Sequence, residues 1–552
     1  MFPGAIPSVA PVVIAGGGPF GLMLALELGR RAIAVVLVDQ DPGTAVNPQA
    51  HATQARTMEH YRRHGFAQEI RKLGLPPDFP TDIAYFTRFA RHELARVPLP
   101  SSAEAERLAR SLTGSWSAAE LPHRCAQKFI EEVLRRHAEA LPGVTIRYGT
   151  RMTAFRQAAD RVEVVVESQQ TGEQRIACDY LIGADGARSL VRQALGIRYA
   201  GESGTLRDFV GGRMYAVYAR IPDFYRAVPH RPAWMNVCFN PERRAFMPAV
   251  DGKGVFTLHT QLRAHEQEER LSVADAQAMV QAAIGAPLEV EVLGRDTWTA
   301  GHSLVAERFA DRRVFIGGDA AHLFTPTGGL GYNTAVEDAV NLGWKLAAVL
   351  KKQAAPTLLG SYEAERRPLA VRNTTYAKGF ADSLGNYKPV PEIEDDSPQG
   401  EAARARAGEY FGAHGRAEFN IPGITFGGRY DGSPAIVADG SLPPPDTANT
   451  YVPTACPGGR APHLWLNDGR SLFDLFGFEW TLLRLAGKRG DAFIESARNA
   501  RIDLTIVDAP SEEARDLYQA DLALIRPDQI VAWRGNDERA AGEILGRLTG
   551  HG

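Results

Sequence analysis

The stretch that decides the fold runs from Pro11 to Asp39 and reads PVVIAGGGPFGLMLALELGRRAIAVVLVD. Residues 11–15 and 34–39 are short apolar runs that predict buried strands, and residues 22–31 between them predict a helix. A strand, a helix and a second strand within about 30 residues form a βαβ unit, which implies a parallel sheet. We therefore expect an α/β fold that begins with a Rossmann-like domain.

Three glycines follow the first strand in the pattern Gly16-x-Gly18-x-x-Gly21. The first allows a tight turn, the second lets the backbone approach a pyrophosphate, and the third lets helix and strand pack closely. The first amides of the helix then face the phosphate charge. Asp39 ends the second strand, where a carboxylate accepts hydrogen bonds from a ribose. The pattern predicts a dinucleotide site; the alternative is a glycine-rich structural turn.

Two later stretches indicate which dinucleotide binds. Residues 181–192 predict a strand that leads into an Asp185-Gly186 turn and a helix, which alone would be an ordinary turn. Residues 313–317 predict another parallel strand, and Asp319 follows it, placed to hold a sugar hydroxyl or a ribityl chain. A glycine-rich loop comes next, and the positive end of the helix after it would point at a flat ring. The loop residues expected at this ring are Gly328, Gly329, Leu330, Gly331 and Asn333.

These three stretches resemble the GxGxxG, DG and GD motifs of the class A flavoprotein aromatic hydroxylases, the family of para-hydroxybenzoate hydroxylase and phenol hydroxylase. The similarity runs from about residue 11 to residue 375. It implies non-covalently bound FAD, with NADPH or NADH as cosubstrate. It also implies a single-component monooxygenase that hydroxylates a phenol-like ring with O2 through a flavin C4a-hydroperoxide. The cofactor carries this chemistry, and the protein supplies orientation, electrostatics and exclusion of water.

The resemblance also assigns individual residues. It implies that Gln127 contacts the flavin and that Pro326 lies over the ring and shapes the oxygen site. It places His51 where relatives carry a catalytic His or Asp that takes the phenol proton; the alternative is a polar loop histidine. The chain departs from the family pattern at Gln49, where Arg is common, at Leu330, where Gln is common, and at Asp39, where Glu is more usual.

The residue patterns along the chain predict several domains. Residues 1–200 and 300–385 are expected to form the FAD-binding domain, residues 201–299 an inserted, largely β substrate domain, and residues 386–447 a linker region. Residues 448–552 resemble the thioredoxin-like C-terminal domain of the phenol-hydroxylase branch. Because the chain has no CxxC pair, this domain is expected to serve in packing or dimerisation. In the β domain, Tyr215, Asn236 and His259 are candidates for the substrate pocket, with plain sheet packing as the alternative.

Composition limits the partners. A net charge of −3 gives no field that favours nucleic acid, and no His/Cys cluster with metal-ligand spacing appears. The apolar run 10–28 is interrupted by glycines and contains Glu27, so a buried strand and helix are expected instead of a signal peptide or a membrane span. We expect a cytoplasmic enzyme that binds a small aromatic substrate and O2, with a homodimer as one option.

Two other functions fit the same motifs. One is an FAD-dependent oxidoreductase of this fold that does not hydroxylate, such as a halogenase or a reductase. The halogenase motif WxWxIP is absent, since Trp298 stands in Thr-Trp-Thr-Ala. The other is a non-catalytic relative that uses the fold to bind a partner protein.

Overall fold

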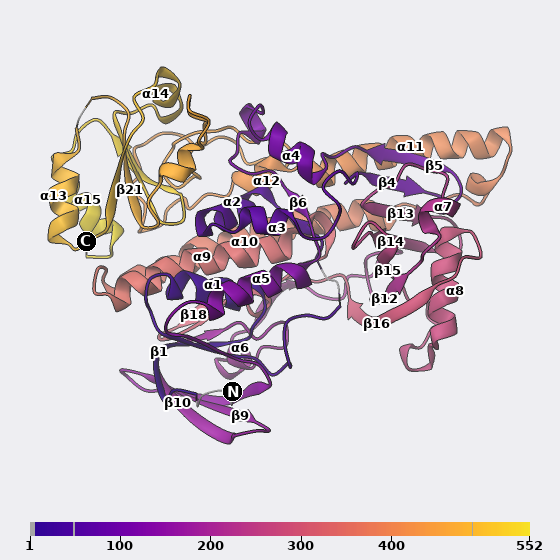
Figure 1. Cartoon of the computed structure of the whole chain (residues 1–552), viewed down its shortest axis with the longest axis horizontal. Coiled ribbons are helices and arrows are strands. Elements are labelled where there is room, and N and C mark those ends of the chain that lie inside the picture. Colours follow the sequence, from indigo (N-terminus) through magenta and orange to yellow (C-terminus); the bar gives the residue numbers. More distant parts are fainter. Residues whose placement is uncertain (1–5, 48–49, 488, 552) are drawn as a thin grey trace.

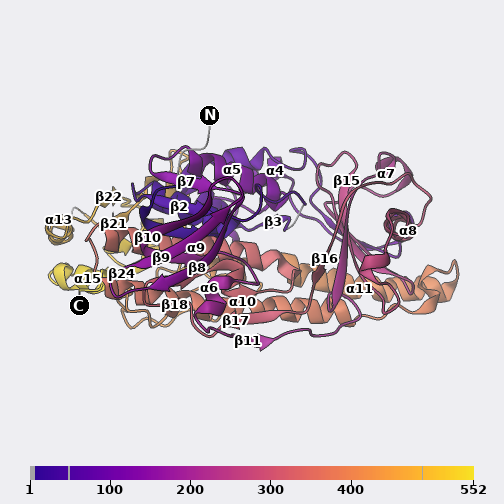
Figure 2. The ribbon, with the colours of Figure 1, turned by 90° about the horizontal axis from the view of Figure 1, so that it is seen from below.

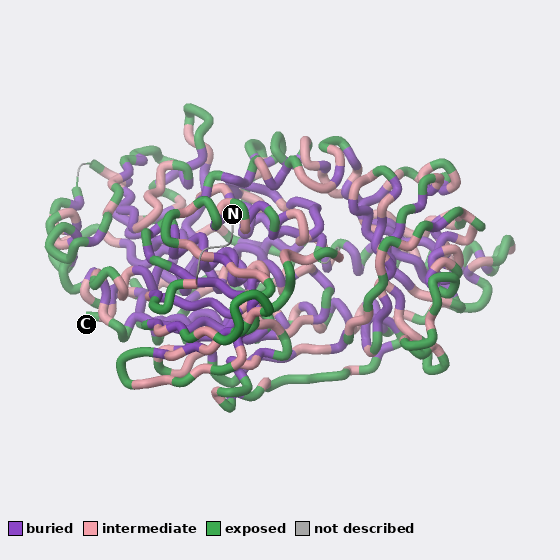
Figure 3. Tube along the Cα trace, turned by 60° about the horizontal axis from the view of Figure 1, so that its bottom comes forward, coloured by how far each residue is buried: buried purple, intermediate pink, exposed green. Residues whose placement is uncertain are grey.

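The computed structural model describes residues 6–47, 50–487 and 489–551, so Gln49 lies outside the described residues. The molecule is elongated: the C-terminal domain lies at one end, a large, mainly antiparallel sheet lies at the other, and the Rossmann-like unit lies between them (Figure 1). The buried residues gather in the strands and helices of the interior, and the exposed residues gather in the loops (Figure 3).

The Rossmann-like sheet has the strand order β18-β19-β10-β1-β2-β7, and β9 and β8 extend it as an antiparallel flap from β10. The central pairs are parallel, as the βαβ unit predicts. Its strands are β1 Val9–Ala15, β2 Val35–Val38, β7 Val144–Arg147, β8 Thr150–Gln157, β9 Val162–Ser168, β10 Gly172–Gly183, β18 Ala310–Asp311 and β19 Val314–Ile316. Its helices are α1 Pro19–Gly29, α2 Ala55–His64, α3 Ala67–Arg71, α5 Gln127–Glu139, α6 Leu190–Ala194, α9 Leu330–Leu350 and α10 Gly360–Asn386.

Helix α1 packs against both α5 and α9, and α10 runs along α9. Strands β1, β2 and β19 and helix α1 are apolar almost throughout, because both faces of the central parallel sheet are covered. Two small sheets lie beside this unit. They consist of β3 Ala52–Thr53 with β6 His123–Arg124, and of β11 Tyr199–Glu202, β17 Ser303–Ala306 and β20 His322–Leu323.

The second large sheet has the order β16-β12-β15-β14-β13-β4-β5. Its strands are β4 Ile83–Phe86, β5 Glu93–Val97, β12 Arg213–Arg220, β13 Met235–Phe239, β14 Arg244–Pro248, β15 Val255–Gln261 and β16 Glu291–Thr299. Helices α7 Phe224–Ala227 and α8 Val273–Ile284 pack on this sheet, as does α11 Pro398–Phe419. Helices α10 and α11 run along the length of the molecule (Figure 2).

Two details of the expected domain boundaries are corrected. Strands β4 and β5 come from residues 83–97, which were assigned to the FAD-binding domain, yet β4 pairs in parallel with β13 of the substrate sheet. Residues 386–447 are not a plain linker, because they contain the 22-residue helix α11, which packs on β4 and β5. Both contacts join segments far apart in the chain, so no local pattern reports them.

The C-terminal domain is a four-stranded sheet of order β22-β21-β23-β24, with one parallel and two antiparallel pairs. Its elements are β21 Trp480–Arg484, α13 Asp491–Asn499, β22 Leu504–Asp508, α14 Glu512–Tyr518, β23 Leu522–Ile525, β24 Val531–Gly535 and α15 Ala541–Leu548. The short helices α4 Ser102–Leu108 and α12 Pro422–Phe426 complete the fold. None of the helices in the described ranges is both long and apolar enough to cross a bilayer.

Candidate active site

The glycine turn after β1 is built as the pattern predicted. Gly16 has φ +117°, and a Cβ there would come within 2.1 Å of the Ala184 carbonyl oxygen. A Cβ on Gly21 would come within 2.0 Å of the Gly16 carbonyl oxygen. At Gly18, by contrast, no atom lies within 4 Å of an added Cβ. Gly16 and Gly21 are therefore required by the protein itself, whereas Gly18, the N-cap of α1, has no described neighbour that would meet a side chain.

Asp39 lies beside this turn. Its Oδ2 accepts a 2.5 Å hydrogen bond from the Gly17 amide, and its Oδ1 accepts one of 2.8 Å from the Asp41 amide. Partial burial raises the pKa of this carboxyl, and the two backbone donors oppose that rise. The carboxylate thus holds the glycine turn against the end of β2.

The two later acidic residues differ in what they contact. Asp185 accepts hydrogen bonds from the Ser189 hydroxyl (2.5 Å) and the Val191 amide (3.1 Å), so it organises the start of α6, and no atom lies within 4 Å of a Cβ added to Gly186. Asp319 follows β19 and is exposed to solvent, yet the surrounding protein raises the pKa of its carboxyl by desolvation.

The glycine-rich loop before α9 has a left-handed backbone at Gly328 (φ +70°) and Gly329 (φ +62°), which lets it turn sharply without side chains. Pro326 is exposed at the start of this loop, and Gly331 lies in the first turn of α9. Leu330 is buried in an apolar cluster with residues of α10 and α12, so only its backbone remains for a cofactor.

Asn333 ties this loop to the segment that carries His51. Its Nδ2 donates to the carbonyl oxygens of Ala52 (2.8 Å) and Gly329 (2.6 Å). Its Oδ1 accepts from the Gln54 amide (2.8 Å) and the Thr57 hydroxyl (2.7 Å). The side chain is fully used within the protein, so the expected contact of Asn333 with the cofactor is limited to its backbone. Its role here is to hold two loops together.

His51 is buried, and its Nε2 is sealed from solvent and has no hydrogen-bond partner among the described residues. Burial and the nearby charge of Lys128 lower the pKa of this imidazole to about 4. Gln127 begins α5 close by: its amide donates to the Ala50 carbonyl (3.0 Å), while its side chain donates to Glu131 (2.6 Å). A neutral, unpartnered ring nitrogen is a free acceptor for a proton or a donor to a ligand.

The strand register places the three candidate pocket residues of the β domain on two different faces of the sheet. His259 lies opposite Ala216 and Phe246, whereas Tyr215 pairs with Thr260. Successive residues of a strand point to opposite faces, so His259 and Tyr215 project from different faces of the sheet. Asn236 pairs with Met247, whose side chain points away from the face of its neighbour Phe246. Asn236 therefore shares the face of Tyr215.

The face that carries His259 meets the FAD-binding domain. Lys128 of α5 donates to the hydroxyl of Tyr218 (3.4 Å), which lies two residues from Ala216 on the same face. The opposite face packs under α7, where the rings of Phe256 and Phe224 are 4.5 Å apart. The expectation that Tyr215 and Asn236 line the substrate pocket is therefore corrected, because both residues point away from the cofactor domain.

His259 is held by two aromatic neighbours that the sequence did not single out. Its ring stacks on Phe246 at 4.6 Å, and its Nδ1 accepts a 3.2 Å hydrogen bond from Trp298 Nε1. Burial, with a contribution from His51, lowers the pKa of His259 to about 3. The neutral ring therefore carries its proton on Nε2. Once the face is known, alternation along β14 and β16 identifies Phe246 and Trp298; without the register it identifies neither.

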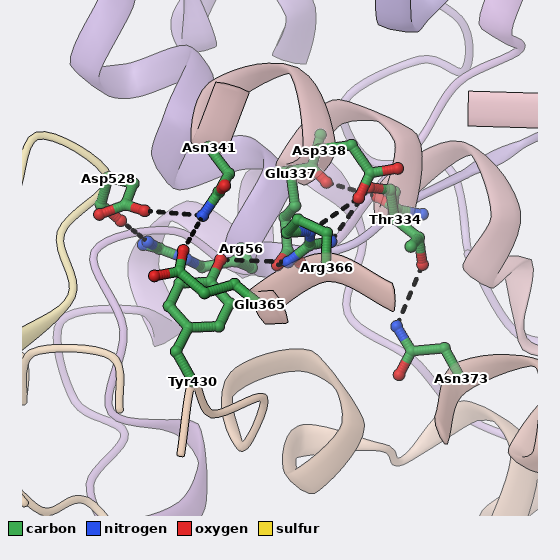
Figure 4. A network of polar contacts seen from close by, with 12 residues as sticks. Arg56, Thr334, Glu337, Asp338, Asn341, Glu365, Arg366, Asn373, Tyr430 and Asp528 are labelled. Carbon is green, nitrogen blue, oxygen red and sulfur yellow. Dashed lines mark hydrogen bonds and ion pairs between the residues drawn. The ribbon is translucent and has the colours of Figure 1, made fainter. Parts of the chain in front are cut away.

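A buried polar network supports helix α9 behind the loop (Figure 4). Arg366 Nε donates to Asp338 Oδ1 (2.7 Å), and Asn341 Nδ2 donates to Glu365 Oε2 (2.6 Å) and to Asp528 Oδ2 (3.3 Å). Burial alone would raise the pKa of Glu365, but the charges of Arg526 and Lys345 lower it far below its usual range. Because Asp528 belongs to the C-terminal domain, this network joins that domain to the helix that begins at the cofactor loop.

Comparison with known proteins agrees with this geometry. Residues 9–377 match the FAD binding domain, and residues 454–551 match the aromatic-ring hydroxylase C-terminal domain. A putative polyketide hydroxylase of Streptomyces halstedii is 32% identical over 97% of this chain and 94% of its own. Aklavinone 12-hydroxylase of Streptomyces purpurascens is 31% identical over 96% of each chain.

Among solved structures, the enzyme RebC with bound 7-carboxy-K252c matches with a TM-score of 0.88 and 32% identity, over 99% of this chain and 100% of its own. The flavin-dependent monooxygenase PieE in complex with FAD and substrate matches with a TM-score of 0.85 and 28% identity, over 99% of each chain. The chain therefore belongs to the aromatic-ring hydroxylase family of FAD-dependent, NAD(P)H-using monooxygenases.

Proposed function

We propose that this monooxygenase hydroxylates a phenol-type ring held between the loop 326–331 and the His259 face of the substrate sheet, with His51 as the first acceptor of the phenol proton. The observation that carries the proposal is the buried, unpartnered Nε2 of His51 on the segment that Asn333 ties to that loop. When bound, FAD reduced by NAD(P)H would activate O2, one oxygen atom of which is transferred to the ring while the other leaves as water.

The residues of this chain support the binding of FAD in one orientation. Gly18 leaves room for the pyrophosphate, Asp39 is placed for a ribose, and Asp319 for the chain that leads to the ring. The loop at Gly328 and Gly329 presents bare backbone to a flat ring. In this arrangement the positive N-terminus of α9 favours negative charge on the reduced flavin.

The lowered pKa of His51 decides what kind of base it is. A phenol has a pKa near 10, so at neutral pH its ring is poorly activated for oxygen transfer. With a pKa of about 4, His51 is neutral at pH 7 and can accept the proton, but it holds that proton weakly. We infer that His51 acts as a relay that passes the proton onward, with the Nε2–H of His259 available to orient an acceptor oxygen of the substrate.

The test compares His51→Ala with the wild-type enzyme on a panel of phenols, following NAD(P)H oxidation, product and hydrogen peroxide. We expect full FAD content, a loss of hydroxylation of about 10²–10⁴-fold and diversion of oxygen to peroxide. Raising the pH should restore part of the product, because the phenolate then forms unaided. His60→Asn is the matched control: His60 is also buried but lies on α2 beside Arg56 and Arg366. This variant should form as much hydroxylated product per NAD(P)H oxidised as the wild-type enzyme does. Wild-type coupling of His51→Ala across pH 6 to 9 contradicts the proposal.

The proposal extends to O2 as cosubstrate and to a cytoplasmic enzyme. All four cysteines are free and buried, which suits a reducing compartment. The homodimer considered from the sequence stays a prediction, which light scattering of the purified protein checks.

A further inference from the structure

Arg124 is a buried cation without a partner. The residue is 6% exposed, and it makes neither a hydrogen bond nor an ion pair with any residue that the structure describes. Every other buried arginine in the described ranges has at least one such partner; Arg366, with Asp338, is an example. Keeping an unpaired guanidinium out of water is unfavourable, and proteins avoid it unless the charge has a use.

The side chain reaches from the cofactor domain to the substrate sheet. Arg124 pairs with Ala52 in the β3–β6 ladder, so both side chains leave the same face of that ladder. The Ala52 Cβ lies against the cofactor loop, since a Cβ on Gly329 would come within 2.8 Å of it. The Arg124 guanidinium carbon lies 4.5 Å from the ring centre of Trp234, which directly precedes β13. The guanidinium therefore lies where the two domains meet.

One edge of the guanidinium keeps some access to solvent. The group has no hydrogen-bond partner among the described residues; its Nη1 is sealed from solvent, whereas Nε and Nη2 are not. The Trp234 ring stabilises the cation through its π face but offers no acceptor, and its own Nε1 is sealed without a partner. Burial lowers the pKa of Arg124 to about 10, so the group stays charged at neutral pH.

We propose that Arg124 binds a carboxylate of the aromatic substrate, so that the enzyme selects hydroxylated aromatic acids over neutral phenols. This inference rests on the proposed function. The planar Nε–Nη2 edge matches a carboxylate, which can accept two parallel hydrogen bonds from it.

The position of Arg124 along the sheet restricts the substrate further. His51 lies near His259 of β15 and contributes to its lowered pKa. Arg124 contacts Trp234, which directly precedes β13, and β14 lies between β13 and β15. Phe246 of β14 stacks on His259 and belongs to the same face. In this proposal the substrate ring spans the distance between His51 and Arg124, with its hydroxyl near His51 and its carboxylate remote from that hydroxyl.

The experiment measures binding to the holoenzyme by isothermal titration calorimetry, with each acid paired with its neutral amide. The probes are 4-hydroxybenzoate, 6-hydroxy-2-naphthoate, anthraquinone-2-carboxylate and the three amides. The acid of the best-fitting pair should bind wild-type enzyme about 30-fold or more tightly than its amide, and Arg124→Met should remove that preference. Arg124→Lys should keep part of it. Lys128→Met is the matched control, a neighbouring cation whose loss should leave the preference in place.

Stability and cofactor content separate the alternatives. Because Arg124→Met removes an unpaired buried charge, we expect its unfolding midpoint to equal or exceed that of the wild type, with one FAD per chain. A lower midpoint makes Arg124 a structural residue, and lost FAD makes it a cofactor ligand; either result overturns the proposal. So does an equal affinity for acid and amide in every pair, or a preference that depends on Lys128. If acids bind through Arg124 but no phenol is hydroxylated, the proposed function fails while the acid site stands.

Discussion

Arg460 of the C-terminal domain and Glu59 of helix α2 form a buried, two-pronged ion pair. Arg460 Nε donates to Glu59 Oε2 (2.9 Å), and Arg460 Nη2 donates to Glu59 Oε1 (2.5 Å). On the same helix, Arg56 donates to the Asp528 carbonyl (2.5 Å) and to the Gln529 side chain (2.7 Å). Helix α2 begins just after the segment that carries His51. The C-terminal domain thus anchors helix α2, which lies next to the candidate active site. This contact is consistent with the packing role expected for the C-terminal domain.

Breaking this ion pair should destabilise the enzyme and loosen the His51 segment. Glu59→Gln leaves the Arg460 charge buried without its counterion, which typically costs about 3–5 kcal/mol. We expect a lower free energy of unfolding in denaturant titrations and faster hydrogen exchange at residues 50–60. The double variant Glu59→Gln/Arg460→Met should recover part of the loss, because it leaves no unpaired charge. Arg539→Met, which removes an exposed ion pair, is the control. Equal losses of stability in Glu59→Gln and Arg539→Met would contradict a stabilising role of the buried Arg460–Glu59 ion pair.

Two glycines of the turn after β1 should fail in different ways. Gly16→Ala places a Cβ 2.1 Å from the Ala184 carbonyl oxygen at a left-handed backbone position, so both folding and FAD binding should be lost. Gly18→Ala meets no protein atom within 4 Å, so it should fold normally but bind FAD poorly, since the methyl group occupies the space for the pyrophosphate. The ratio of flavin to protein absorbance, together with the unfolding midpoint, checks both. Full flavin content in Gly18→Ala would show that the pyrophosphate binds elsewhere.

The Trp298 hydrogen bond should set the tautomer of His259. With Trp298 Nε1 donating to Nδ1, the neutral ring keeps its proton on Nε2. Trp298→Phe removes the donor, so both tautomers become populated, and substrate binding should weaken by about 5-fold, the equivalent of one ordinary hydrogen bond. A rise in KM with little change in kcat and with normal FAD content is the expected result. Nitrogen-15 chemical shifts of labelled histidine report the tautomer directly, and an unchanged tautomer would refute the assignment.

Several buried histidines should make the protein acid-sensitive. Burial lowers the pKa of His51 and of His64 to about 4, and of His123 to about 3, from 6.5 in the unfolded chain. Between these values the unfolded chain binds more protons than the folded one, so stability is complete above pH 6.5 and falls as the pH drops toward 4. Denaturant titrations from pH 7.5 to 4.5 should show this decline. His123→Gln should make it shallower, and a flat profile down to pH 5 would contradict the shifts.

Carboxylates add to this loss at lower pH. The pKa of Glu27 is lowered: burial opposes the shift, and the charges of Arg63, His64 and Arg31 outweigh burial. A carboxyl with a lowered folded pKa contributes stability above its unfolded value near 4.5, and that contribution disappears as the pH falls below it. The decline should therefore steepen below pH 4.5.

The parts of this protein that the sequence determined by itself are those with a local physical cause. The turn at Gly16 and Gly21 follows from the left-handed backbone at Gly16 and from the close contact of Gly21 with Gly16, and the apolar runs around it follow from burial of both faces of a parallel sheet. The loop at Gly328 and Gly329 is local in the same sense. The GD motif and the carboxylate of Asp39 could be located because each ends a predicted strand.

The tertiary structure decided everything that depends on which surfaces meet. A strand pattern shows that His259 and Tyr215 lie on opposite faces, but which face meets the cofactor domain depends on helices from other parts of the chain. The pairing of β4 with β13 and of Arg460 with Glu59 joins residues separated by more than a hundred positions. The isolation of Arg124 is of the same kind: a sequence displays a charge, and only the folded chain shows that no opposite charge in its described part pairs with it.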